Sequence, residues 1–275
     1  MNSAALRLQI ETALSPRIAS ALTPAQRVLR PLAPTGISAV DEGLGGGLPL
    51  GAITEMAGPE CSGRTSAALS FLAGMTRTAK ICAWIDVLNM LHPESAAASG
   101  VDLSRLLWVR CGARIRNEPD SQPAVKHGGR PPAKPWLRIE QALRVTDLLL
   151  QAGGLGAIVL DMAGVAPEYV SRVPLATWFR YRAAAERTEA SLLLLTQYPC
   201  AKSSAELLLR LQPGHAHREE ATVFTGIEHR LEAAHRRFMG QSIPDFALPG
   251  FAPRKPPQSV TYANWRSRTT WAGPR

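Results

Sequence analysis

The sequence lacks the long apolar runs of a membrane protein and the paired cysteines of a zinc or disulfide protein. Its longest apolar runs, 157–160 and 192–195, fall far short of the roughly 20 residues that span a bilayer, so we expect no membrane contact. The four cysteines lie far apart without a CxxC pair, which argues against a zinc site. The N-terminus carries Glu11 and no continuous apolar core, so we expect no secretory signal and a cytoplasmic location with reduced thiols.

Acidic side chains are also scarce, with 22 Asp and Glu against 31 Lys and Arg, and the formal net charge is +9. The excess lies in two segments. Residues 110–145 hold eight basic and three acidic side chains, and residues 202–275 hold 11 and six, whereas residues 1–109 hold eight of each. An anionic partner such as nucleic acid fits this pattern, and a basic surface without a specific partner fits it equally.

Proline and glycine divide the chain into three parts. Prolines break residues 1–34 into short pieces, so we interpret them as an N-terminal arm with a short helix at 3–14. Residues 35–241 are interpreted as the core, interrupted by a flexible insertion at 112–135 that is rich in Pro, Gly and basic residues. Residues 242–275 are interpreted as an extended basic and aromatic tail.

Within the core, apolar segments alternate with helical patterns. Strands are predicted at 52–57, 81–87, 106–111, 157–161 and 191–197, edge strands within 222–238, and helices at 65–76, 139–151, 169–189 and 205–211. Strands that are apolar along their whole length and separated by helices are typical of a parallel sheet covered on both sides. The predicted fold is therefore α/β, with a mostly parallel sheet and helices on both faces.

A glycine-bounded loop between the first strand and the first helix has the spacing of a phosphate-binding loop. Its residues are Gly58, Pro59, Glu60, Cys61, Ser62, Gly63, Arg64, Thr65 and Ser66. Glycines let backbone N–H groups point inward, and the following helix adds its N-terminal dipole, so the segment is predicted to bind a nucleotide. Arg64 replaces the usual lysine. A guanidinium can hold a phosphate by a forked hydrogen bond, but it is bulkier than an ammonium and less suited to follow a migrating phosphoryl group.

Two further polar residues end predicted strands near this loop. Asp161 closes the strand 157–161, at the position from which an acid meets Mg²⁺, and Thr65 is the predicted second Mg²⁺ ligand. Gln197 ends the next strand and is a candidate sensor of the γ-phosphate. Many strands end in Asp, and an ordinary polar residue at a strand edge explains Gln197 equally well. ATP and Mg²⁺ are the candidate cofactors.

The tail carries the candidate partner-binding residues, which are Phe246, Phe251, Trp265, Arg266, Arg268 and Trp271. Aromatic and Arg side chains are usual anchors of protein interfaces, and we expect a protein partner. The same side chains suit stacking on single-stranded DNA, and an unused tail is a third interpretation.

Taken together, residues from about 35 to 212 resemble the RecA family of recombinases. The similar segments occur in the same order and read GLGGGLPLGAITEMAGPECSGRT, ICAWIDVLNMLHP, SGVDLSRLLWV, EQAL, AIVLD and LLLLTQ. The resemblance implies a RecA-like P-loop core.

Several positions depart from the RecA family. Leu88 stands where the family has the glutamate that polarises the attacking water, and a leucine is no general base. His92 stands where the family has an adenine-side aspartate. The two loops that contact DNA in the family are short here, at 162–171 and 198–204. We therefore expect no catalytic residue and little ATP hydrolysis.

A RecA-like core with these losses resembles the ImuA family. That resemblance implies a nucleoid-associated accessory protein of damage-induced (SOS) mutagenesis and translesion synthesis. The implied partners are an ImuB-like Y-family polymerase homologue, an error-prone replicative-type polymerase and RecA. Two alternatives remain: an active DNA-dependent ATPase and recombinase, and a regulator of RecA filaments that acts through residues 1–34.

Overall fold

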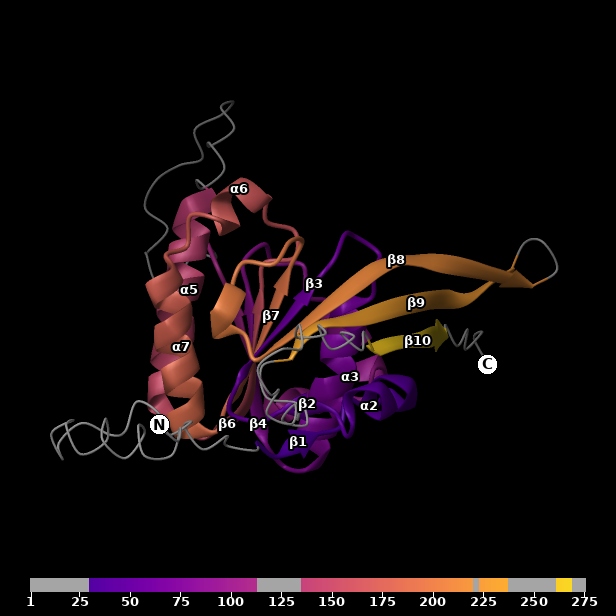
Figure 1. Cartoon of the computed structure of the whole chain (residues 1–275), viewed down its shortest axis with the longest axis horizontal. Helices are drawn as coiled ribbons and strands as arrows, with labels where there is room; N and C mark the ends of the chain where they lie inside the picture. The colour runs from indigo at the N-terminus through magenta and orange to yellow at the C-terminus, as the bar shows by residue number, and fades with distance from the viewer. Residues whose placement is uncertain (1–29, 113–134, 220–222, 237–260, 269–275) are drawn as a thin grey trace, which may run out of the picture.

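The computed structural model describes residues 30–112, 135–219, 223–236 and 261–268, which form a central sheet with helices on both faces (Figure 1). The sheet has eight strands in the order β10-β9-β8-β3-β7-β6-β4-β5. Their bounds are β3 Ile53–Ala57, β4 Ile81–Asp86, β5 Leu106–Arg110, β6 Leu155–Asp161, β7 Ser191–Thr196, β8 Leu207–Glu219, β9 Val223–Arg236 and β10 Thr261–Arg268. The six strands β8, β3, β7, β6, β4 and β5 pair in parallel, and β9 and β10 add an antiparallel edge next to β8. The predicted α/β fold with a mostly parallel sheet is confirmed.

Helices lie on both faces of the sheet. In Figure 1, α5 and α7 stand side by side on one face, and α2 and α3 lie on the other. The helices are α2 Ser38–Leu44, α3 Arg64–Arg77, α4 Pro93–Ala98, α5 Pro135–Ala152, α6 Pro167–Val170 and α7 Leu175–Thr188, with short 3-10 turns η1 Leu103–Arg105 and η2 Lys202–Ser204. A small antiparallel pair of β1 Leu32–Ala33 and β2 Leu48–Pro49 lies beside them.

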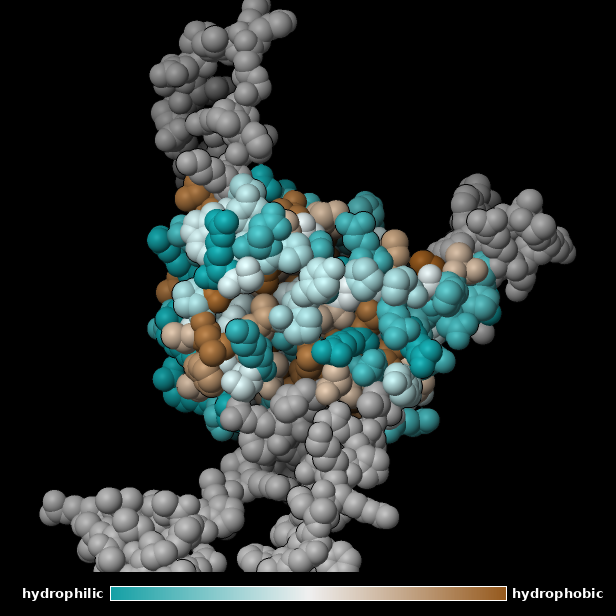
Figure 2. Space-filling view, turned by 45° about the horizontal axis from the view of Figure 1, so that its top comes forward, coloured by the Kyte–Doolittle hydropathy of each residue, from teal (hydrophilic) through white to brown (hydrophobic). Residues whose placement is uncertain are grey.

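The run of four leucines in β7 shows how the sheet divides the core in two. Leu193 and Leu195 pack with α3 in one buried cluster, whereas Leu192 and Leu194 pack with α5 and α7 in the other. Side chains alternate between the faces of a strand, so a strand that is covered on both sides must be apolar throughout. On the outer surface shown in Figure 2, apolar side chains appear as patches between hydrophilic ones.

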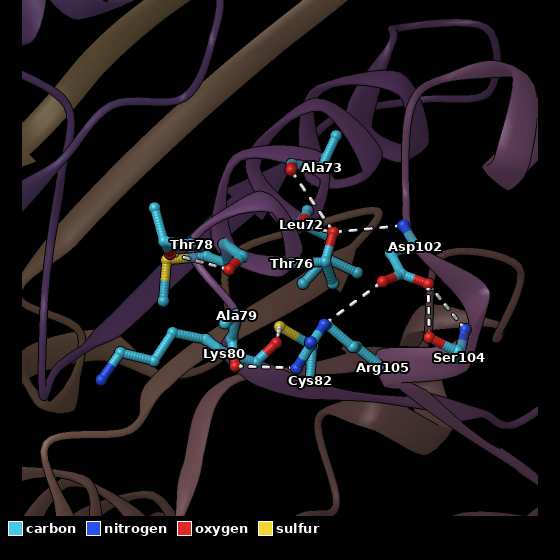
Figure 3. Close-up of polar contacts among 11 residues, drawn as sticks. Leu72, Ala73, Thr76, Thr78, Ala79, Lys80, Cys82, Asp102, Ser104 and Arg105 are labelled. Atoms are coloured by element: carbon cyan, nitrogen blue, oxygen red, sulfur yellow. Dashed lines mark hydrogen bonds and ion pairs between the residues drawn. The ribbon is translucent and has the colours of Figure 1, made fainter.

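Polar side chains join the end of α3 to the segment that leads into β5 (Figure 3). The hydroxyl of Thr76 donates to the carbonyl oxygen of Leu72 at 2.9 Å and accepts from the amide of Asp102 at 3.2 Å. Arg105 contacts the Asp102 carboxylate at 3.2 Å and donates to the carbonyl oxygen of Ala79 at 3.2 Å. These contacts give partners to the Asp102 amide and the Ala79 carbonyl oxygen and tie the segment before β5 to the end of α3.

Two sequence-based predictions differ from the structure. The predicted helix at 205–211 is wrong, because β8 begins at Leu207 and pairs with β3. Leu207, Leu209 and Leu211 are buried and Arg210 is exposed, so the period is that of a strand. Part of the predicted tail belongs to the sheet, since β10 pairs along its whole length with β9.

The remaining predicted elements are largely confirmed. The predicted helix 169–189 is two helices, α6 and α7, with Pro174 at the start of the second. The edge strand expected within 222–238 is β9. The predicted helix at 3–14 and residues 113–134 of the predicted insertion lie outside the described residues. Among the helices that are described, none has the length and apolarity needed to cross a membrane.

Candidate phosphate-binding site

The segment predicted to bind phosphate leads from the end of β3 into α3 and has the curled backbone that such a loop requires. Cys61 and Gly63 have positive φ angles of 57° and 87°, which turn the chain tightly before the first helical residue. The amide of Gly58 donates to the carbonyl oxygen of Thr196 at 3.1 Å, which ties the loop to the end of β7. A Cβ on Gly58 would collide with the carbonyl oxygen of Leu211 in β8, so only glycine fits there.

The loop faces a cavity of about 200 Å³ whose opposite wall comes from β9. Residues Cys61 to Ser66 line one side, and Ile227 and His229 line the other. His229 lies so close to the loop that a Cβ on Gly63 would approach its Nδ1 to 2.6 Å. Burial lowers the pKa of His229, which favours the neutral imidazole. The cavity at the phosphate loop is therefore open on one side, and the neutral side chain of His229 closes the other.

Arg64 borders this cavity, but its guanidinium is bonded to this chain's own backbone. Its side chain is 6% exposed, and its Nη1 donates to the carbonyl oxygen of Thr196. Burial lowers the pKa of this guanidinium, and the charges of Asp161 and Glu60 oppose that effect. The residue in the lysine position thus holds the end of β7.

The predicted Mg²⁺ ligands meet in a second cavity, of about 370 Å³, on the other side of the α3 N-terminus. Thr65 and Asp161 both line it. Burial raises the pKa of Asp161 to about 6, and the carboxylate accepts a 3.0 Å hydrogen bond from the amide of Ala163. A hydroxyl and a carboxylate are oxygen ligands of the kind that Mg²⁺ prefers, so the donor set fits this ion.

Asp86 sits beside Asp161 at the end of the neighbouring strand but is already engaged. Its carboxylate accepts from the amides of Met90 and Leu91 at 3.0 and 2.8 Å and from Nε1 of Trp108 at 3.2 Å. These bonds shape the loop after β4, so Asp86 serves as a structural anchor.

Leu88 forms part of an apolar wall of the same cavity. A Cβ on Gly164 would approach its Cδ1 to 2.8 Å, which shows how closely the leucine packs over the loop after β6. His92 caps α4 by accepting from the amide of Ser95 at 3.2 Å, and its Nε2 pairs with Glu94 at 2.9 Å. Leu88 therefore packs and His92 caps a helix, and neither has the role of the family residue at its position.

The structure places the other predicted site residues around this centre. Gln197 lies near Pro59 and Glu60 on the outer side of the loop and does not line the cavity of Thr65 and Asp161. Trp265 packs behind the loop, with its ring centroid 4.9 Å from that of His229, and Arg266 is exposed. Phe246, Phe251, Trp271 and the side chain of Arg268 lie outside the described residues.

The sequence reasoning did not find two residues that shape the site. One is His229, whose role depends on the pairing of β9 with β8. The other is Glu55, 1% exposed in the central strand β3, whose Oε1 accepts from the amide of Cys200 at 2.6 Å. An acidic residue inside a predicted buried strand was the available signal, because a buried charge requires partners.

Comparison with known proteins agrees with the fold and the loop. The RecA N-terminal domain family matches residues 9–113. Protein RecA of Salinispora tropica is 38% identical over 129 residues, which cover 46% of this chain and 30% of that protein. Protein RecA of Arthrobacter is 39% identical over the same shares of the two chains. These matches support a RecA-superfamily protein.

The matches to the RecA proteins are partial, because this chain spans under a third of the length of those two relatives. The family match includes the phosphate loop and Leu88 but ends before Asp161. The crystal structure of the RadB recombinase aligns with a TM-score of 0.51 and 17% identity, and the alignment covers 75% of this chain and 91% of that one. At this identity the likeness shows the RecA-like fold alone.

Proposed function

We propose that this RecA-superfamily protein is a non-recombinase accessory protein of DNA repair that hydrolyses ATP poorly or not at all. Its role lies in damage-induced mutagenesis and translesion synthesis, as the resemblance to the ImuA family implies. It acts by contacts with an ImuB-like polymerase homologue, an error-prone replicative-type polymerase and RecA. The proposal concerns the whole protein, for which the partial matches to RecA supply only the family background.

The observation that supports the proposal most is the hydrogen bond from Arg64 to the carbonyl oxygen of Thr196. A cation that stabilises a leaving phosphoryl group must be free to contact it in the transition state. Arg64 is buried and bonded to the backbone, so it contributes to the fold in place of the reaction. Leu88 removes the group that would activate water, since a methyl group accepts no proton.

Weak nucleotide binding is compatible with this loss of chemistry. The backbone of residues 58–63 and the N-terminus of α3 would hold the phosphates. Thr65 and Asp161 would hold Mg²⁺, which would neutralise phosphate charge. In this proposal the nucleotide, when bound, stabilises a conformation of the loop and is not consumed.

ATP turnover by the full chain, with and without single-stranded DNA, tests the proposal directly. We expect turnover at background level under both conditions. Isothermal titration with ATP and Mg²⁺ should show weak binding that Arg64→Ala changes by less than about threefold, because the guanidinium is already bonded to the carbonyl oxygen of Thr196. Hydrolysis stimulated by single-stranded DNA would refute the proposal and favour an active recombinase.

The proposed partners require a separate test in cells. A tagged full chain should recover a polymerase subunit or a recombinase from cells with damaged DNA. Recovery of neither would contradict the accessory role. Because β10 belongs to the sheet, tail variants should be Phe246→Ala with Phe251→Ala, or a truncation after Arg268, which leave this strand intact.

The three-part division of the chain also remains a proposal. Deletion of 1–29 leaves β1 in place and should preserve the fold while removing contacts of the predicted arm. Loss of recombinase recovery by this deletion alone would indicate a regulator of RecA filaments. Loss by the tail variants would indicate a scaffold that binds through its tail.

A further inference from the structure

A cavity of about 390 Å³ opens between the loop after β6 and the loop after β7. Its floor consists of Val165, Val170 and Val173, which are buried. At its rim, Leu175 is 39% exposed and Tyr198 is 65% exposed. Exposed apolar side chains around an apolar floor are typical of a site that receives an apolar group.

The core fixes the shape of this cavity. The buried carboxylate of Glu55 accepts from the amides of Cys200 and Ala201, at 2.6 Å and 3.2 Å, and so holds the loop after β7 from below. Lys202 follows with a φ of 48°, a left-handed conformation that a lysine adopts only when its surroundings enforce it. A cavity fixed in this way loses little conformational entropy when a ligand binds.

The rim of the cavity is positively charged. Arg172 and Lys202 line it, and among the described lining residues none is acidic. The guanidinium of Arg172 lies over the ring of Tyr169, 5.3 Å from its centroid, and within the described part of the chain neither cation forms an ion pair. The cavity therefore complements a ligand that has an apolar centre and negative flanks.

This chain does not offer such a segment from its own longer undescribed parts. Residues 1–29 hold three basic and one acidic side chain, residues 113–134 hold five and two, and residues 237–260 hold three and one. Like charges would oppose the docking of any of these segments at Arg172 and Lys202. The occupant that fits is therefore part of another molecule.

The lining favours a peptide over single-stranded DNA. Bases bind mainly by stacking on flat aromatic or guanidinium faces. Among the described lining residues Tyr198 is the one aromatic side chain, the guanidinium of Arg172 already lies over the ring of Tyr169, and the floor of the cavity is made of valines. Branched aliphatic side chains instead surround a leucine or phenylalanine side chain well.

We propose that the cavity between the loops after β6 and β7 binds an apolar side chain of an acidic peptide segment on a partner protein. The apolar side chain fills the valine-lined floor, and carboxylates on either side of it contact Arg172 and Lys202. The proposal deepens the proposed function by naming the kind of partner segment, and it rests on that function. Its test needs no ATP, so failure of the ATPase proposal and failure of this one are distinguishable.

Selection from a random peptide library on the immobilised full chain tests the proposal. We expect the enriched peptides to share one large apolar residue flanked by Asp or Glu. A fluorescein-labelled enriched peptide should lose about tenfold or more in affinity to Ser171→Trp, which fills the cavity from its exposed edge. The combined charge reversal Arg172→Glu and Lys202→Glu should weaken binding by about tenfold at low salt and by less at high salt.

Arg187→Glu is the matched control, because it reverses an exposed charge on α7 that does not line the cavity. It should leave the affinity unchanged, and circular dichroism should show the same fold for all variants. Failure to enrich any peptide, enrichment of basic peptides, or equal binding by Ser171→Trp would overturn the proposal. Binding of labelled oligothymidylate that Ser171→Trp abolishes would also overturn it, in favour of a nucleic-acid site.

Discussion

The phosphate loop and the cavity between the loops after β6 and β7 lie at the same edge of the sheet, yet their cations are placed in opposite ways. Arg64 is buried and donates to this chain's own backbone, whereas Arg172 and Lys202 line an open cavity. A side chain whose hydrogen bonds are made internally gains little from a ligand, and an exposed cation without an acidic neighbour remains available to one. The contrast separates a cation that stabilises the fold from cations that remain available to a ligand.

The largest effect is expected from Glu55, which supports the open cavity. Glu55→Ala leaves the amides of Cys200 and Ala201 without their acceptor and creates a void, so the free energy of unfolding should fall by about 3 kcal/mol. Urea denaturation measures this change. Glu168→Ala removes an exposed carboxylate of α6 and should change stability by less than about 0.5 kcal/mol. Equal stability of the two variants would show that the loop after β7 does not depend on Glu55.

A comparison of two glycine substitutions examines the phosphate loop. Gly58→Ala forces a Cβ against the carbonyl oxygen of Leu211 and should destabilise the protein by about 2 kcal/mol. Gly74→Ala is the matched control within α3, because its Cβ would meet only the carbonyl oxygen of Pro34 at 3.7 Å. Better helix propensity should make that variant more stable by up to about 1 kcal/mol. Thermal unfolding that shifts in the same direction for both variants would contradict the close packing of the loop on β8.

Arg64 should matter for stability more than for binding. Arg64→Ala removes the bond to the Thr196 carbonyl oxygen and the packing of a long side chain, so a loss of about 1 to 2 kcal/mol is expected in chemical denaturation. Arg77→Ala removes an exposed arginine at the other end of the same helix and should cost much less. The interpretation would be reversed if the unchanged protein bound ATP tightly and a stable Arg64→Ala protein did not, because the guanidinium would then contact the nucleotide.

The sequence predicted the parallel part of the fold well and the antiparallel edge less well. Runs such as 157–161 and 191–197 are apolar throughout, and a covered parallel strand is the structure in which such short runs are most stable. The pattern predicts a helix at the start of β8 because Leu207, Leu208, Leu209 and Leu211 suit both periods, and only pairing with β3 decides between them.

Some features of the candidate site could likewise be predicted from the sequence, and others could not. The backbone shape of residues 58–63 follows from local glycine spacing, so it could be predicted. The meeting of Thr65 with Asp161 follows from the order of strands in a parallel sheet. The placement of His229 and Trp265 beside the loop depends on the register of β8, β9 and β10 across about 50 residues, which no local pattern encodes.

The smallest predicted effect concerns this wall of the phosphate loop. Burial lowers the pKa of His229 below its usual value of 6.5 in the folded protein, so the unfolded chain binds a proton more readily than the folded chain. The contribution of His229 to stability should therefore fall as the pH decreases through about 6.5. Urea denaturation above and below this pH measures the difference, and His229→Asn should show a smaller one, because it removes the group that titrates. Burial raises the pKa of Asp161 to about 6, so protonation of this carboxylate favours the folded protein over the same range and opposes the trend; Asp161→Asn should therefore make it steeper. Unfolding that is equally pH-dependent with and without His229 would mean that this side chain reaches water, and that the phosphate loop is as open as the cavity beside it.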